Sequence, residues 1–108
     1  MADLFLNKKK DLTTDGNVEL YTVPSETIAV VRSILVSNDD TSNACEITIT
    51  LLNTDDTVFS LFKQKDISAK TTNELLTNTL VLNEDEEIKV QAENANDLHV
   101  VMSAMEIS

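Results

Sequence analysis

The sequence is poor in the residues that build covalent, metal and cofactor sites. Its 108 residues include one cysteine, one histidine, one glycine, one proline and no tryptophan. A single cysteine excludes an internal disulfide framework and a cysteine-rich zinc site. A single glycine excludes the glycine-rich loops that bind phosphate groups. Because one tyrosine and three phenylalanines are the only aromatic residues, the core must consist mainly of isoleucine, leucine and valine.

Positive charge is also scarce. Eight lysines and arginines stand against nineteen aspartates and glutamates, which gives a formal net charge of -11. Binding nucleic acid through its phosphates needs a basic surface, and an acidic protein is repelled by anionic membranes. The N-terminus lacks the features of a signal peptide, and no apolar run approaches the ~20 residues that span a bilayer. We therefore expect neither a nucleic-acid nor a membrane partner, and synthesis in a cytoplasm.

Catalytic residues are not expected. His99 is the only histidine, and a serine such as Ser33 or Ser103 would have to meet it together with a carboxylate. No nucleophile elbow or comparable local signature accompanies it. Cys45 begins an alternating segment, where a free cysteine usually acts as a small buried hydrophobic residue. We expect a protein that is not an enzyme.

The longest apolar run, residues 27–38, is rich in β-branched residues and predicts a central strand. Strict alternation divides it into two apolar faces. One face would carry Ile28, Val30, Ile34 and Val36, and the other Ala29, Val31 and Leu35. A strand with one wet face alternates more cleanly, so we expect both faces to be covered by sheet, by chain or by another subunit.

The other apolar segments are short and separated by turn signals rich in asparagine and aspartate roughly every 8–12 residues. We expect strands at residues 18–23, 45–51, 58–62, 72–76, 79–82, 88–93 and 98–107, with a turn at 63–66. The pattern predicts an all-β fold: an antiparallel β-sandwich of jelly-roll or Ig-like type, with eight to nine short strands and little or no helix. Residues 1–15 would form an N-terminal arm or edge strand, and residues 16–108 a single domain.

Two surfaces are candidate interfaces. The first is the apolar start of the arm, Leu4, Phe5 and Leu6, which precedes the only cluster of lysines. The second is a patch that combines the second faces of the first and last long strands: Val31, Leu35, Val101 and Met105. Either the arm or a long loop covers this patch, or a subunit or partner does.

Arg32 is a charge within the central apolar run. Because a lone buried charge is costly, its side chain must be paired, exposed or displaced by a β-bulge. We expect a bulge or a salt bridge at the sheet edge, and the alternative is a contact with a neighbouring subunit.

Acidic turns raise the question of calcium. Residues 39–40, 55–56 and 84–87 are clusters of carboxylates, which calcium favours as ligands, but no EF-hand spacing is present. Turns of an acidic protein are acidic in any case, so we expect solvated turns and no cofactor. Calcium held between loops or between subunits is the alternative.

The order of these segments resembles a known group of proteins. The relevant segments are 20–24 (LYTVP), 29–38 (AVVRSILVSN), 47–51, 61–63, 80–82, 88–92 and 99–107. Together they resemble small virion structural proteins of tailed bacteriophages, β-sandwich modules of the capsid-decoration or the tail- or neck-associated type, over residues 20–107. Such proteins often place glycine in three turns. Here those turns read Ser25-Glu26, Ala69-Lys70 and Glu84-Asp85-Glu86.

The resemblance implies attachment rather than catalysis. The expected function is that of a virion structural protein, bound to the capsid or to the tail or neck and associating with other virion proteins and with copies of itself. The alternative is a monomeric β-sandwich module that binds calcium or carbohydrate, although few aromatics are present to form a sugar platform. The sequence leaves open head versus tail, the copy number and symmetry, the host, and whether the arm is exchanged between subunits.

Overall fold

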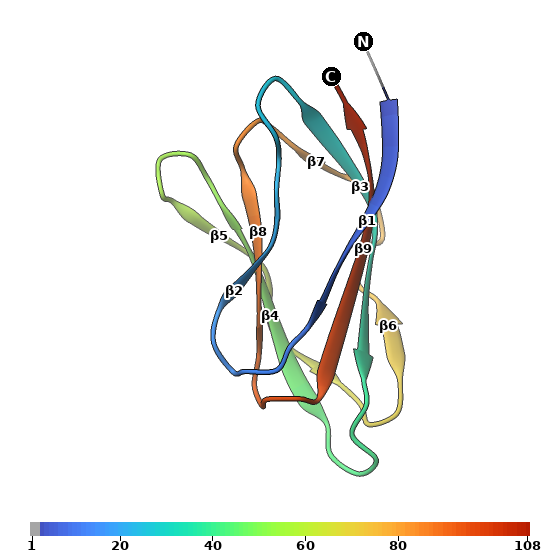
Figure 1. Ribbon diagram of the computed structural model, residues 1–108. Coiled ribbons are helices and arrows are strands. Elements are labelled where there is room, and N and C mark those ends of the chain that lie inside the picture. Colours follow the sequence, from blue (N-terminus) through green and yellow to red (C-terminus); the bar gives the residue numbers. More distant parts are fainter. Residues whose placement is uncertain (1–2) are drawn as a thin grey trace.

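A computed structural model describes residues 3–108 as nine strands in two antiparallel sheets, and no helix in that range could cross a membrane. The strands are β1 (Asp3–Asp11), β2 (Val18–Thr22), β3 (Ile28–Asn38), β4 (Cys45–Leu52), β5 (Val58–Ile67), β6 (Thr72–Glu74), β7 (Leu80–Leu82), β8 (Glu87–Ala92) and β9 (Leu98–Ile107). Sheet A has the order β1-β9-β3-β6, with β7 also paired to β3, and sheet B the order β2-β8-β4-β5. The sheets face each other (Figure 1), which confirms the predicted β-sandwich.

The strand pairs are nested one inside the next. β1 pairs with β9, β2 with β8, β3 with β7 and β6, and β4 with β5. The chain is thus one long antiparallel hairpin rolled up so that its successive pairs alternate between two sheets, which is the topology of a jelly roll. The Ig-like alternative is excluded, because its sheets pair their strands in a different order.

The core lies between the sheets and is built by period-two alternation. On β4, Cys45, Ile47 and Ile49 have no exposed area, while Thr48 and Thr50 face outward, because successive side chains of a strand point to opposite faces. Burial raises the pKa of the Cys45 thiol above its ordinary value. The facing residues of sheet A are equally apolar, and the buried set includes Ala29, Val31, Ile34, Val36, Leu98, Val100 and Met102.

A β-bulge at Arg32 changes which residues of β3 face the core. The register with β9 shifts between Val31 and Ser33, and Arg32 is exposed. The bulge predicted for Arg32 is therefore confirmed. The predicted position of Val31 on the outer face is wrong, because strict alternation was carried through the bulge. Val31 is fully buried, and Val30 faces outward in its place.

The turn expected at residues 63–66 is replaced by a continuing strand. β5 runs on to Ile67, which is fully buried. Gln64 has a φ of 52°, and its amide donates to the Thr48 hydroxyl at 3.1 Å. A left-handed residue within a strand kinks it without reversing its direction, so the polar composition of this segment marks an irregularity in an edge strand.

Three turns keep a backbone geometry that favours glycine although the chain has another residue there. Glu26, Lys70 and Asp85 have φ values of 58°, 59° and 66°. They lie in the three turns where the resemblance to virion proteins leads one to expect glycine. Because side chains are disfavoured in the left-handed region, these turns keep their shape at a cost in backbone strain.

Candidate interaction surface

The outer face of sheet A carries a row of apolar side chains in register across four strands. Phe5 lies opposite Met105, Met105 opposite Val30, and Val30 opposite Val81. Paired residues of adjacent strands point to the same face, so these four side chains form one line, here called the apolar row. Phe5 is 74% exposed and Val81 56% exposed. The pair Ile28 and Ile107 extends the row toward the end of the sandwich where β1 begins and β9 ends (Figure 1).

A second, smaller apolar pair lies further along the same face. Leu35 and Val101 are partners in the ladder, and each is 37% exposed. The rung formed by Asn7, Ser103 and Ser33 separates them from the apolar row. Of the patch predicted from the sequence, Leu35, Val101 and Met105 lie on the outer face, whereas Val31 does not.

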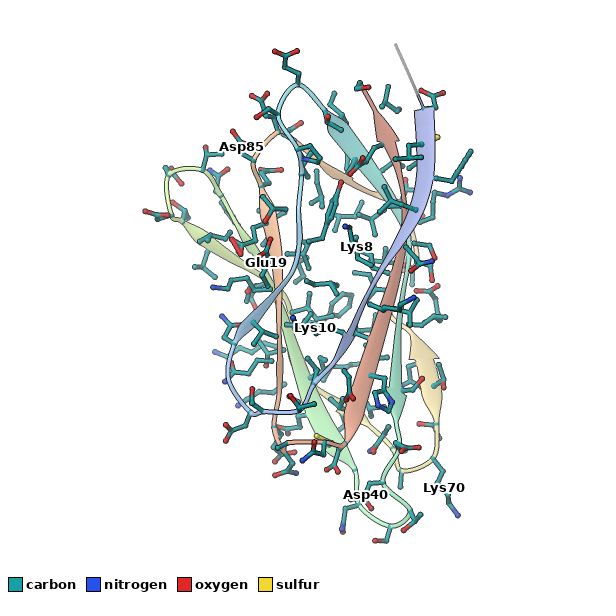
Figure 2. The ribbon with its side chains drawn as sticks, viewed as in Figure 1. Lys8, Lys10, Glu19, Asp40, Lys70 and Asp85 are labelled. Atoms are coloured by element: carbon teal, nitrogen blue, oxygen red, sulfur yellow. The ribbon has the colours of Figure 1, made fainter. Side chains whose placement is uncertain are left out.

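The arm divides its apolar residues between the two faces of sheet A. Phe5 belongs to the apolar row, whereas Leu6 is half-buried against the core of its own chain. Leu4 lies opposite Glu106 at the end of the sandwich and is exposed. Lys8 and Lys10 extend from β1 toward sheet B (Figure 2), where the Lys8 ammonium lies 5.9 Å from the centre of the Tyr21 ring.

Sequence reasoning missed half of the apolar row. Strict alternation places Val30 on the face opposite Val31, so the predicted patch contains Val31 in its place, and Val81 is not part of that patch. The available signal was Arg32, because placing the bulge there reverses the alternation after it. Arg32 lines a surface depression together with Phe5, Asn7 and Ser103, so it lies beside the apolar row.

The hairpin between β4 and β5 presents a further apolar pair that the sequence did not indicate as a surface. Val58 is 60% exposed and Phe59 52% exposed. The hairpin projects away from the body of the sandwich (Figure 1). This pair consists of the same two residue types as Val81 and Phe5 but lies on the other sheet. It can therefore serve as a control for substitutions in the apolar row.

The outer face of sheet B is polar. One depression on this face has a volume of about 210 Å³ and is lined by Thr48, Gln64, Gln91 and neighbouring acidic residues. No aromatic ring lies in this lining. The two outer faces therefore differ, one with an apolar row and one with a polar surface.

His99 does not form part of a nucleophilic site. Its Nε2 lies 3.3 Å from Asp11 Oδ1, so the histidine contacts the end of β1. Ser37 is its ladder neighbour, but the Ser37 hydroxyl is hydrogen-bonded to Thr72 at 2.8 Å. A catalytic serine needs a base within hydrogen-bond reach, and no such bond joins His99 to a serine in residues 3–108.

Carboxylates in the acidic turns accept hydrogen bonds from backbone amides of the same turns. Asp40 accepts from the amides of Ser42 and Asn43, and these bonds lower its pKa below the ordinary value. Asp40 and Asp85 lie at opposite ends of the sandwich (Figure 2), so their loops cannot share one ion. Across residues 3–108, no three histidine, cysteine or acidic side chains are arranged to hold a metal.

One edge of sheet A is closed by two short strands and a carboxylate. β7 pairs with residues 29–31 of β3, and β6 with residues 35–37, which leaves a gap at the bulge. Glu74 fills this gap: it accepts from the Ile34 amide at 2.9 Å, from the Leu76 amide at 3.2 Å and from the Ser33 hydroxyl. Natural sheets close their edges in such ways to avoid unwanted pairing.

We expect Glu74→Gln to reduce the pH dependence of stability below pH 5. Partial burial raises the pKa of Glu74, but the hydrogen bonds from Ser33 and the two amides outweigh it, so the net pKa is lowered. A lowered folded-state pKa stabilises the fold above the unfolded-state pKa and loses this effect as the pH falls through the folded-state value. Urea unfolding at pH 6 and pH 3 should show the wild-type advantage over the variant shrinking at pH 3.

The control for this measurement is Asp66→Asn, which removes an exposed carboxylate on β5. A difference between wild type and Glu74→Gln that stays constant from pH 6 to pH 3 would contradict the role given to the Glu74 carboxylate.

Neither a protein-family model nor a curated protein sequence matches this chain. Solved structures do share its fold. The capsid structure of Helicobacter pylori bacteriophage KHP30 matches with a TM-score of 0.55 at 12% identity, over 100% of this chain and 94% of that chain. A structure of Bacillus endospore appendages, which form disulfide-linked pili, matches with a TM-score of 0.53 at 6% identity, over 99% and 85% of the two chains. A chain of infectious bursal disease virus, Gx strain, matches with a TM-score of 0.51 at 8% identity, over 96% of this chain and 28% of its own length. At these identities the likeness establishes the fold alone.

Proposed function

We propose that this protein is a non-enzymatic structural subunit of a bacteriophage virion that binds its neighbours through the outer face of sheet A. The observation that carries the proposal is the apolar row, whose four side chains lie in register on an exposed sheet face. An antiparallel sandwich usually keeps its outer faces polar, as sheet B does here. A contiguous apolar patch on a soluble domain marks an interaction site.

The fold and the remaining surface support the same role. A jelly roll is shared with a phage capsid structure and with pili, although a fold by itself does not assign a function. His99 meets no nucleophile, and the acidic turns satisfy their own backbone amides. The occupant of the apolar row is a second copy of this chain, because identical sheets can bury the same row on both sides of a two-fold contact.

The finer assignment rests on the resemblance of residues 20–107 to tailed-phage virion proteins. The subunit decorates the capsid or belongs to a tail or neck layer, as a homo-oligomer that needs no cofactor, nucleic acid or membrane. Arg32 borders the contact, Leu4 lies at the end of the sandwich beside it, and the polar face of sheet B points outward.

Light scattering behind a size-exclusion column tests the proposal. We expect the mass to rise from monomer to a defined oligomer as the protein concentration is increased, because the contact buries apolar surface. The purified protein should also co-sediment with virions of its phage that lack it. A monomer at every concentration that does not bind virions would refute the structural role.

A further inference from the structure

β1 is held mainly by its backbone. Eight of its nine residues are exposed, and only Leu6 is half-buried, yet nine register pairs join the strand to β9. Among its side chains, Lys8 lies over the Tyr21 ring and Asp11 contacts His99, and both interactions are at the surface. A backbone ladder does not depend on which copy of a chain supplies the strand, since every copy presents the same donors and acceptors.

β9 would be a long open edge if β1 left it. It has ten residues, and on its inner face Val100 and Met102 are fully buried in the core. The opposite edge of sheet A is already closed by β6, β7 and Glu74. An open edge of this length has to be covered, and a strand from another molecule covers it as well as the chain's own strand.

The connection from β1 to β2 has the features of a hinge. Residues 13–17 are all exposed and include Gly16, the only glycine of the chain. Leu12, just before them, is buried and bonds through its amide to the Leu98 carbonyl at 3.1 Å. Leu12 therefore belongs with β1 as its inserted end. Five extended residues reach roughly 17 Å, which allows β1 to leave its own sheet.

We propose that β1, with Leu12, is exchanged between copies of this chain and pairs with β9 of a second copy in the assembled form; this rests on the proposed function. Charge favours this partner. β1 has three lysines and two aspartates, a formal charge of +1. Because the whole chain has a formal charge of -11, the rest of the chain carries -12. Because Phe5 moves with β1, exchange also builds each apolar row from two chains.

Disulfide trapping between single-cysteine variants tests the exchange. Asn7 and Ser103 are exposed ladder partners, and the Cα atoms of such partners lie ~4.5–5.5 Å apart, within the range of a disulfide. In a Cys45→Ala background, Asn7→Cys protein is mixed with Ser103→Cys protein, unfolded, refolded at high concentration and oxidised. We expect a covalent heterodimer that a reducing agent separates. The control is Lys9→Cys mixed with Ser103→Cys. These two positions lie on the same face but are not ladder partners, so they should give several-fold less covalent heterodimer.

The variant with both Asn7→Cys and Ser103→Cys in one chain separates the outcomes. Exchange predicts covalent dimers or larger covalent multimers from it, because each disulfide then joins two chains. Closed monomers from this chain, with no heterodimer in the mixture, would overturn the exchange. If light scattering shows that these same samples are assembled, the proposed function survives on the apolar row alone. If every sample is monomeric, both proposals fail.

Discussion

Phe5→Ser combined with Val81→Thr should weaken self-association by roughly ten-thousandfold. One phenylalanine and one valine at the two ends of the apolar row contribute about 3 kcal/mol per chain when an interface removes them from water, and a two-fold contact loses this contribution from both chains, about 6 kcal/mol in all. Because both side chains are exposed in the single chain, the free energy of unfolding should change by no more than about 0.5 kcal/mol. Light scattering over a concentration series measures the first effect, and urea unfolding at a monomeric concentration measures the second.

The matched control is Phe59→Ser with Val58→Thr. It makes the same two substitutions at exposed positions on the β4–β5 hairpin. The two variants therefore lose the same side chains and differ in which surface of the protein is changed. Association should stay within threefold of the wild type. If the hairpin variant dissociates and the row variant does not, the interface lies on the hairpin and the proposed contact is wrong.

Asn38→Ala should lower the free energy of unfolding by about 3 kcal/mol and the Tm by roughly 10–20 °C. Asn38 ends β3 and is 3% exposed. Its amide group donates to the carbonyls of Ile67 at 2.8 Å and Asn43 at 3.0 Å, and its Oδ1 accepts from the Asp40 amide at 2.9 Å. Alanine would leave the buried Ile67 carbonyl without this donor and release the loop from the end of β5. Thermal unfolding followed by circular dichroism measures the loss.

Asn94→Ala is the control, because Asn94 is an exposed asparagine in the loop between β8 and β9. Its Tm should remain within a few degrees of the wild-type value. An Asn38→Ala protein that melts together with this control would show that the buried amide contributes little to the fold.

The strands were predictable because the signals that define them are local. The segments at 45–51, 88–93 and 98–107 match β4, β8 and β9 to within one residue at either end. Alternation and turn residues both act within a few positions of the chain. The turn predicted at residues 63–66 is wrong because their polarity is typical both of a turn and of an exposed edge strand.

The candidate surface was predictable only in part. The sequence placed apolar residues on the second faces of the first and last long strands, and Leu35, Val101 and Met105 lie there. It could not place Val81, since β7 has three residues and its position beside β3 depends on a contact fifty residues away in the chain. The apolar pair on the β4–β5 hairpin is exposed for the same reason: the hairpin projects where no other strand covers it.

By itself the sequence determined an all-β chain of eight to nine strand segments with a hydrocarbon core, without the residues for a disulfide framework or a phosphate loop. These properties depend on composition and on spacing between near neighbours. Only the tertiary structure decided that the strands pair as a jelly roll and that Val30 rather than Val31 faces outward. Strand pairing joins residues far apart in the chain, and a single bulged residue at Arg32 reverses which side chains reach the surface.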